Sequence, residues 1–283
     1  MQVITTVREM QQACRALKNT STLGLVPTMG ALHGGHLSLV ARALAEGDVV
    51  AASIFVNPTQ FAPGEDYDVY PRAFDDDCAK LEAAQVTVLF APSAAEMYPL
   101  GMTTFVDVPE VGGRLDGASR PGHFRGVATV VAKLFNIVDP DRAYFGQKDA
   151  AQIAVLRAMI LDFNVPVHLI ACPIVREPDG LAMSSRNRNL SAHDRQRALI
   201  LHEALHATGE RLQAGETSAE VLRNAILTTF AMDPNLRPDY VAIVDPATLL
   251  PISDTTRGAL IAVAAWVGST RLIDNILVEA PHA

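Results

Sequence analysis

Two histidines three positions apart, His33 and His36, are the residues of this 283-residue chain whose type and spacing point most directly to chemistry. They follow an apolar run at 23–27 and enclose Gly34 and Gly35. Imidazoles can bind phosphate oxygens, and one can pass a proton. The two glycines lack Cβ atoms, so a ligand can approach their backbone closely. The stretch therefore predicts a phosphate-binding turn.

A strand and a helix are expected on either side of this turn. The run at 23–27 is typical of a short buried strand, and apolar residues recur at helical spacing over 37–44. A helix beginning near His36 would present unpaired N–H groups and the positive end of its dipole, which attract phosphate.

Residues 33–36, His-Gly-Gly-His, resemble the nucleotide signature of the adenylyl-transferring α/β superfamily that includes the class I aminoacyl-tRNA synthetases. Neither of the two common phosphate-loop patterns occurs in this stretch. Two other interpretations stay open, a helix-capping turn with surface histidines and a zinc pair. A zinc site needs three or four ligands, and no Cys or His cluster joins these two.

Polar residues also follow other expected strands. Asn57 and Gln60 come after the apolar run at 49–56, where ligands bind in parallel sheets. Gln60 can both donate and accept, although an Asn-Pro turn explains the pattern equally well. Lys148 is a candidate phosphate ligand and Asp149 a ribose acceptor, with Gln152 one turn further on. A routine helix cap is the alternative for this second group.

Three charged segments carry weaker signals. Residues 184–188, Ser-Ser-Arg-Asn-Arg, could clamp an anion or simply cap a helix. Residues 112–126 predict a long glycine-rich loop whose Arg114, Arg120, His123 and Arg125 could cover an anionic ligand, or form an ordinary connection. The acids at 75–77 are expected to be solvated at a helix start, with a metal site as the alternative.

The order of expected elements predicts an α/β protein with a parallel sheet wrapped by helices. Strands are expected at 23–27, 49–56, 86–90, 103–108 and 142–146, and over 165–175. The turn at 176–180 is the expected domain boundary. A smaller α+β unit should follow, with helices at 191–213 and 218–230 and strands at 240–244, 260–267 and 271–278.

Composition excludes several classes of protein. Hydrophobic residues make up 49% and charged residues 19%, which suits a folded core and not a disordered chain. The net charge of −8 argues against a nucleic-acid surface, and no apolar run is long enough to span a membrane. The N-terminal residues lack a signal-peptide pattern, and the three scattered cysteines suit a reducing cytoplasm.

Six segments together resemble the pantothenate synthetase family: PTMGALHGGH at 27–36, SIFVNPTQF at 53–61, YPR at 70–72, RPGHFRGV at 120–127, FGQKD at 145–149 and DGLAMSSRN at 179–187. The resemblance implies ATP-dependent condensation of (R)-pantoate with β-alanine through a pantoyl-adenylate, releasing AMP and pyrophosphate. It also implies a Rossmann-like domain at 1–176, a C-terminal lid at 177–283, magnesium, and a cytoplasmic homodimer.

The resemblance also implies a role for individual residues. The catalytic group would be His36 as proton donor with His33, Lys148 and Arg186. Pantoate would be held by Gln60 and Gln152, with Asn57 beside them, and Gln60 would also contact β-alanine. ATP would contact Met29, Gly30, Ala31, Leu32, His33, Gly34, Gly35, His36, Gly146, Gln147, Lys148, Asp149, Val175, Met183, Ser184, Ser185 and Arg186. No protein ligand for a metal is assigned.

The chain departs from the family pattern in two places. Gln147 stands where Glu is expected, and Ala150-Ala151 where a larger aromatic residue and a Gln are expected. Two other functions therefore stay open. One is a nucleotidyltransferase that stops at an adenylylated product, and the other is a nucleotide-binding protein without catalysis.

Overall fold

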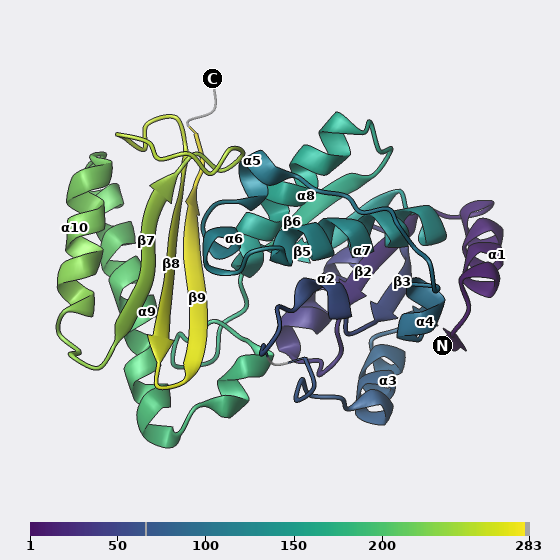
Figure 1. Cartoon of the computed structure of the whole chain (residues 1–283). Helices are drawn as coiled ribbons and strands as arrows, with labels where there is room; N and C mark the ends of the chain where they lie inside the picture. Colours follow the sequence, from purple (N-terminus) through teal and green to yellow (C-terminus); the bar gives the residue numbers. More distant parts are fainter. Residues whose placement is uncertain (66, 281–283) are drawn as a thin grey trace. The chain divides into compact units, whose positions relative to one another are not determined.

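The computed structural model describes residues 1–65 and 67–280, and these form two compact units. The first unit comprises Met1–Gly146 and Val155–Pro173, and the second comprises Gln147–Ala154 and residues 174–280. Figure 1 labels the helices and strands of the chain. The expected domain boundary at residue 176 stays a prediction.

The first unit is built on a six-stranded sheet with the order β1-β4-β3-β2-β5-β6. Its strands are β1 (Gln2–Ile4), β2 (Leu23–Thr28), β3 (Val49–Ile54), β4 (Val88–Phe90), β5 (Arg142–Gly146) and β6 (His168–Cys172). Neighbouring strands pair in parallel, so their carboxyl ends lie at the same edge. From β2 the chain runs to β3 and β4 on one side and later to β5 and β6 on the other. The carboxyl end of β2 therefore lies at a switch point, where α/β sheets bind ligands.

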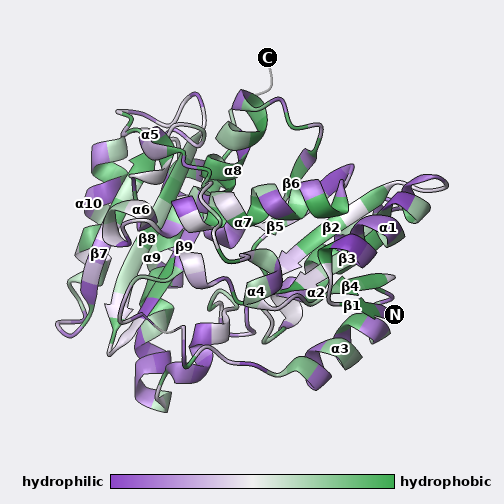
Figure 2. Ribbon diagram, turned by 45° about the vertical axis from the view of Figure 1, so that its right-hand side comes forward, coloured by the Kyte–Doolittle hydropathy of each residue, from purple (hydrophilic) through white to green (hydrophobic). Residues whose placement is uncertain are grey.

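Helices cover this sheet and complete its core. They are α1 (Val7–Lys18), α2 (Gly34–Ala45), α3 (Phe74–Ala83), α4 (Ala94–Met97), α5 (Pro109–Gly112), α6 (Asp116–Ser119), α7 (His123–Val138) and, from Val155 onward, α8 (Ala150–Asp162), with a 3-10 turn η1 (Pro58–Gln60). The strands are mostly hydrophobic in colour in Figure 2. Leu39 and Val40 of α2 pack with Val26 and Val50 of the sheet and with Leu81 of α3. This packing fixes helix α2, which begins at the segment 29–36 that carries His33 and His36 and is called the histidine turn below.

The second unit contains a three-stranded antiparallel sheet of β7 (Arg237–Val244), β8 (Ala259–Val267) and β9 (Thr270–Val278). A two-residue turn joins β8 to β9, and Gly268 there has a φ of 59°. The helices α9 (Ala192–Gln213) and α10 (Ala219–Phe230) bury Leu201 and Leu222 against it. Two 3-10 turns, η2 (Gln147–Asp149) and η3 (Ser185–Asn189), also belong to this unit.

The predicted α/β fold with a smaller α+β part is confirmed. The strand expected at 103–108 is wrong: the Val106 N–H donates to Thr129 Oγ1 at 3.0 Å, and that hydroxyl donates in turn to the Arg125 carbonyl at 2.7 Å. A side chain thus accepts the hydrogen bond that a strand partner would accept. The loop expected at 112–126 is also wrong in part, since it contains α6 and the start of α7. Strand β1 and helix α1 were not predicted.

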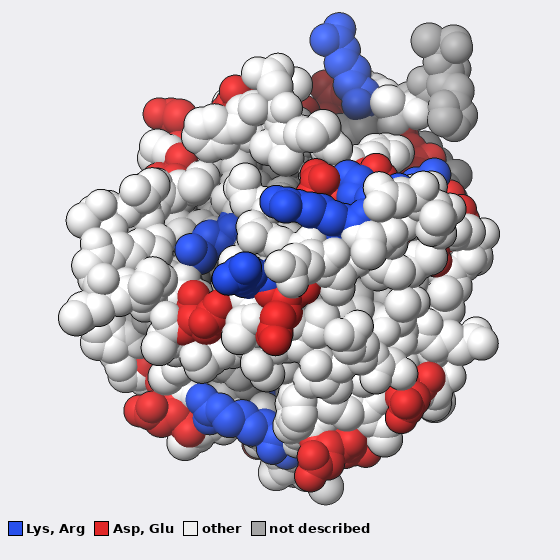
Figure 3. Space-filling view, turned by 90° about the vertical axis from the view of Figure 1, so that its right-hand side faces the viewer, with Lys and Arg blue, Asp and Glu red and all other residues white. Residues whose placement is uncertain are grey.

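Within the described residues, no helix combines the length and the apolar character needed to cross a membrane. On the face shown in Figure 3, acidic and basic side chains lie interspersed in small groups.

Candidate functional site

The histidine turn leaves β2 through a sharply bent backbone. Thr28, the last residue of β2, donates from Oγ1 to the Ser53 carbonyl at 2.7 Å and accepts the Gly30 N–H at 3.2 Å. Gly30 and Ala31 then take positive φ angles of 82° and 51°. Glycine is needed at the first of these, because a Cβ there would lie 3.0 Å from Asp77 Oδ2.

Asp77 closes the turn from helix α3. Its two carboxylate oxygens accept the N–H groups of Ala31 and Leu32, each at 2.7 Å, and its exposed fraction is 1%. Lys80, one turn further along α3, donates to the Leu32 carbonyl at 2.9 Å. The expectation of three solvated acids is therefore wrong for Asp77, because it pairs with backbone groups that would otherwise be buried unpaired.

This arrangement limits how the turn can bind phosphate. The N–H groups of Ala31 and Leu32 already donate to Asp77, so these two residues can shape the site but have no N–H left to offer. Donation to a phosphate would then fall to the imidazoles and to the start of α2.

The two imidazoles are fixed against each other at that start. His33 is the N-cap of α2, and its Nδ1 accepts the Gly35 N–H at 3.2 Å. His36 Nδ1 accepts the His33 N–H at 3.3 Å, and the ring centroids lie 4.1 Å apart. Because each Nδ1 is an acceptor, the proton of each neutral ring lies on Nε2. The helix-capping interpretation is thus correct for Nδ1 of each ring.

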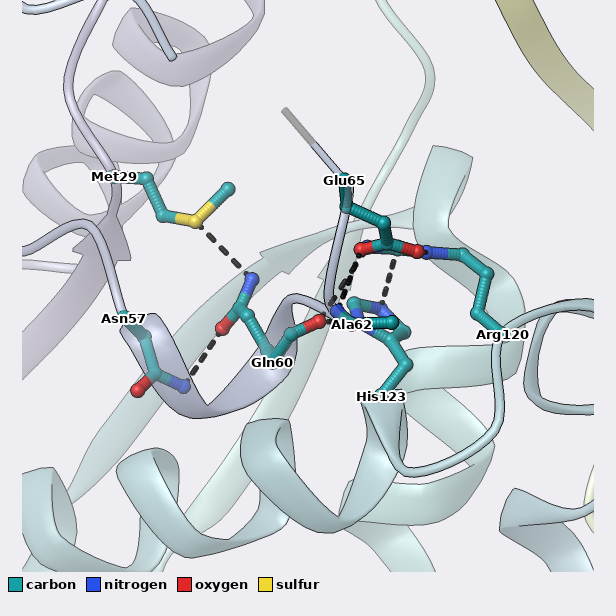
Figure 4. Close-up of polar contacts among 7 residues, drawn as sticks. All are labelled: Met29, Asn57, Gln60, Ala62, Glu65, Arg120 and His123. Carbon is teal, nitrogen blue, oxygen red and sulfur yellow. Dashed lines mark hydrogen bonds and ion pairs between the residues drawn. The ribbon is translucent and has the colours of Figure 1, made fainter. Parts of the chain in front are cut away.

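Gln60 lies at the end of η1, which follows β3, and it is 9% exposed (Figure 4). Its Nε2 donates to the Met29 sulfur at 3.1 Å, and its Oε1 accepts from Asn57 Nδ2 at 2.9 Å. A thioether is a weak acceptor, so an oxygen of a ligand would be a better partner for this Nε2. The structure therefore brings Gln60 together with Met29 of the histidine turn.

Asn57 has a different environment from the one expected of a ligand-binding residue. Its Oδ1 accepts from Tyr98 Oη at 2.7 Å and from Thr59 Oγ1 at 2.9 Å, and its Nδ2 also donates to the Gly126 carbonyl at 3.1 Å. Burial raises the pKa of Tyr98, which keeps its hydroxyl protonated and donating. Asn57 at 1% exposure is thus committed to protein partners and orients the amide of Gln60.

The predicted cations of 112–126 are already engaged. Arg120 pairs with Glu65 at 2.7 Å, Arg114 with Glu110 at 3.6 Å, and Arg125 lies over the Phe105 ring at 4.3 Å. The hydrogen bonds from Arg120 hold the pKa of Glu65 below its ordinary value. Sequence reasoning missed Glu65, because its partner lies 55 positions away.

In the second unit, Asn275 of β9 organises the turn η2. Gln147 Nε2 donates to Asn275 Oδ1 at 3.2 Å, and Asn275 Nδ2 donates to the carbonyls of Gln147 and Lys148, both at 3.0 Å. Lys148 Nζ lies 3.9 Å from Asp149 Oδ1. Gln152 follows in the first turn of α8, half-buried and in the same unit. Gln147 is therefore a structural partner of β9 in this chain.

Val175 and Met183 lie side by side, since the Met183 N–H donates to the Val175 carbonyl at 2.9 Å. Ser184 follows as the N-cap of η3 and accepts the Arg186 N–H at 3.3 Å. An ion pair between residues 98 positions apart supports this segment: Arg176 donates twice to Asp274, at 2.6 and 3.0 Å. The Met183 N–H is thus already engaged within the protein.

Lys148 and Ser184 line one small cavity of about 10 Å³ together with Asn187 and Asp274. That volume corresponds to about one water molecule. The side chain of Asn187 donates to the Ala182 carbonyl at 3.1 Å, while its Oδ1 is buried without a hydrogen-bond partner among the described residues. Within the same described part of the chain, no group of three or more His, Cys, Asp or Glu side chains could hold a metal ion.

Comparison with known proteins gives consistent results. The family model described as pantoate-beta-alanine ligase matches residues 2–277. The chain is 55% identical to the pantothenate synthetase of Acidobacterium capsulatum over 291 residues, covering 98% of this chain and 97% of the relative. It is 55% identical to that of Roseiflexus castenholzii over 280 residues, covering 99% and 100%.

Two solved structures are similar along the whole chain. The pantothenate synthetase of Thermus thermophilus superposes with a TM-score of 0.93 at 49% identity, covering 99% of this chain and 100% of that one. The pantoate-beta-alanine ligase of Francisella tularensis, complexed with beta-gamma ATP and beta-alanine, has a TM-score of 0.75 at 35% identity, covering 98% and 97%.

Proposed function

The chain belongs to the family of pantoate-beta-alanine ligases, and we propose that it joins (R)-pantoate to β-alanine through a pantoyl-adenylate. The family resemblance drawn from six sequence segments is thereby confirmed, as is the expectation of an enzyme of this family. The adenylate route, the ligand contacts and the assembly are proposals.

The proposed reaction has two steps. An oxygen of the pantoate carboxylate attacks the α-phosphorus of ATP, and the bond to pyrophosphate breaks. The amine of β-alanine then attacks the acyl carbon, loses a proton, and expels AMP. A carboxylate needs this activation because an oxide-like oxygen is a poor leaving group, and no covalent enzyme nucleophile is required.

The geometry of the imidazole pair is the observation that supports this proposal most directly. With both Nδ1 atoms accepting from backbone, His33 and His36 would present Nε2–H donors to phosphate oxygens, where negative charge develops as pyrophosphate departs. We assign the proton-donor role to His36. Gly34 and Gly35 would let the phosphates approach the start of α2, and Gly30, Ala31 and Leu32 would shape that approach.

Pantoate is assigned to Gln60 and Gln152, and β-alanine to Gln60. Gln60 suits this role because its Nε2 donates to the Met29 sulfur, a weak acceptor that an oxygen of the substrate would replace. Asn57 is assigned to orienting Gln60, since its own amide already bonds to Gln60 and Gly126. This assignment refines the expectation that Asn57 binds substrate.

The second unit is assigned to the nucleotide. Lys148 and Arg186 would bind phosphate, with hydroxyls from Ser184 and Ser185. Gly146, Gln147 and Asp149 would lie along the ribose, and Val175 and Met183 along the adenine. Lys148 and Ser184 lie close enough to line one cavity, although its volume of about 10 Å³ is that of a single water molecule. We assign the chain from residue 177 the role of a lid.

Magnesium is proposed to accompany the triphosphate. Mg²⁺ is commonly held by substrate phosphates with one or two carboxylates and not by a dedicated protein cage. When bound, the ion would neutralise phosphate charge.

A homodimer and a cytoplasmic location are proposed from the family resemblance. The thiols of Cys14, Cys78 and Cys172 are free, as a reducing compartment would keep them.

Pyrophosphate exchange tests the route. With ATP, pantoate and labelled pyrophosphate but no β-alanine, label should enter ATP only when pantoate is present. Addition of β-alanine should then release AMP and form pantothenate. Exchange without any β-alanine-dependent AMP would indicate the nucleotidyltransferase instead. ATP binding without exchange or AMP would indicate a nucleotide-binding protein that lacks catalysis.

A further inference from the structure

His123, at the first position of α7, bridges two groups that fix which of its nitrogens carries a proton (Figure 4). Its Nδ1 lies 2.8 Å from the Gln60 carbonyl oxygen, and its Nε2 lies 3.1 Å from Arg120 Nη1. A carbonyl can only accept, so Nδ1 must carry the proton. A guanidinium can only donate, so Nε2 must be bare. The ring is therefore neutral, in the Nδ1–H form.

Arg120 links this ring to an acidic partner. Its Nε and Nη2 donate to the two oxygens of Glu65 at 2.9 and 2.7 Å, and Nη2 also lies 3.4 Å from the Gln60 carbonyl. Glu65 in turn accepts the Ala62 N–H at 3.2 Å. The Gln60 carbonyl is thus held by His123 and Arg120 together. The side chains of Arg120 and Glu65 are 17% and 24% exposed.

Close packing between η1 and the first turn of α7 brings His123 to the Gln60 carbonyl. A Cβ on Gly126, one turn into α7, would lie 2.3 Å from the Thr59 carbonyl oxygen, so η1 and α7 touch through backbone. Asn57 holds the other side of η1 by its bond to the Gly126 carbonyl. Gln60 is thus fixed at its side chain by Asn57 and at its carbonyl by His123.

We propose that His123, Arg120 and Glu65 are positioning residues that hold the backbone of Gln60, so that its amide is aimed at the substrate. The proposal rests on the assignment of Gln60 to pantoate and β-alanine. It requires a neutral His123, because a protonated ring would place two donors face to face and release Arg120. Burial, and then the charge of Arg120, lower the pKa of His123 to about 4, against the smaller opposing effects of the hydrogen bond to the Gln60 carbonyl and of the charges of Asp116 and Glu65.

Nuclear magnetic resonance tests the proton placement without any catalysis. In the full chain with ¹⁵N-labelled histidine, the His123 ring should report a proton on Nδ1 and none on Nε2, from about pH 8 down to about pH 5. The His123→Phe variant identifies the signal by its loss. A proton on Nε2, or a charged ring at about pH 6, would overturn the proposal whether or not the chain makes pantothenate.

Steady-state kinetics test the effect on Gln60. His123→Phe keeps a planar aromatic ring, although a larger one, and removes both hydrogen bonds, so the KM for pantoate should rise about fivefold or more while the KM for ATP changes less than about twofold. His206→Phe is the matched control, because His206 lies on α9 with its side chain 65% exposed. An unchanged KM for pantoate in a folded His123→Phe chain would overturn the proposal.

If His123→Phe does not fold, the variant Glu65→Gln tests the same proposal. Glu65→Gln keeps one acceptor for Arg120 and removes the charge, so the KM for pantoate should rise, by less than in His123→Phe. Asp233→Asn is its control, since Asp233 pairs with Arg197 at 2.8 Å in the second unit. An unchanged KM in Glu65→Gln would count against the proposal. Failure of the parent chain to form pantothenate would instead refute the proposed function.

Discussion

The carboxylate of Asp77 accepts the N–H of Ala31 at 2.7 Å, although the two residues lie 46 positions apart in the chain. Its other oxygen accepts the next N–H, that of Leu32, also at 2.7 Å. Helix α3 thus holds the turn that leads to His33 and His36. The positive φ angles of Gly30 and Ala31 are sustained by this pair of charge-assisted hydrogen bonds.

Asp77→Asn should lower the free energy of unfolding by about 1–3 kcal/mol, because one backbone N–H would then face an amide NH₂ in a buried site. The value of kcat/KM should fall with it, since the turn places both imidazoles. Chemical denaturation and steady-state assays measure the two effects. Asp75→Asn makes the same charge change at an exposed position of the same helix and should leave both within error. Equal effects of Asp77→Asn and Asp75→Asn would contradict the role of Asp77 in holding the turn.

Gly126→Ala should destabilise the chain, although alanine is the better helix former, because the added Cβ would lie 2.3 Å from the Thr59 carbonyl oxygen. Gly209→Ala in α9 has open space around its Cβ and should stabilise by up to about 1 kcal/mol. Thermal unfolding of the two variants should therefore shift in opposite directions. A stabilised Gly126→Ala would show that η1 and α7 do not touch through backbone.

The stability of the chain should depend on the protonation of His123. Its pKa is lowered to about 4 by burial, whereas in the unfolded chain it has its ordinary value of 6.5. Between these values the unfolded state binds the extra proton, so this contribution is complete above about pH 6.5 and is lost as the pH falls towards 4. The slope should approach about 1.4 kcal/mol per pH unit.

Denaturation curves at several pH values, compared with those of His123→Phe, isolate this contribution because all other groups are shared. The difference in unfolding free energy should change with pH only within that window. A difference that is constant from about pH 7 to about pH 4.5 would mean that the His123 pKa is the same in both states.

His36→Ala should reduce pantoate-dependent pyrophosphate exchange by ~10²-fold or more, on the scale of a removed transition-state donor. The fold should persist, because the lost bond to the His33 N–H is a helix-cap interaction that contributes about 1 kcal/mol. His206→Ala, at an exposed position, serves as the control. Near-normal exchange in a folded His36→Ala chain would refute the role of this imidazole.

Local patterns in the sequence were sufficient to predict most of the sheet. Apolar runs marked β2, β3 and β5 because buried parallel strands are apolar throughout. The spacing of His33 and His36 marked the turn, since both residues act within one helix start. Strand β1 was missed because three residues carry too little periodicity to be recognised.

Contacts between distant residues could not be predicted in this way. Nothing near Asp77 or Glu65 distinguishes them from ordinary surface acids, because their partners lie 46 and 55 positions away. Thr129 likewise replaces a strand partner for Val106 through tertiary packing. The pairing of Arg120 with Glu65 follows from the same kind of long-range contact, whereas the pairing of Arg114 with Glu110 is local.

Transfer of an oxygen atom from pantoate to AMP tests most directly the central claim that the reaction passes through a pantoyl-adenylate. Pantoate labelled with ¹⁸O in its carboxylate is incubated with the chain, ATP and β-alanine, and the products are examined by mass spectrometry. A pantoyl-adenylate predicts one ¹⁸O in the phosphoryl group of AMP, because the carboxylate oxygen leaves with it. Unlabelled AMP formed together with pantothenate would contradict the account.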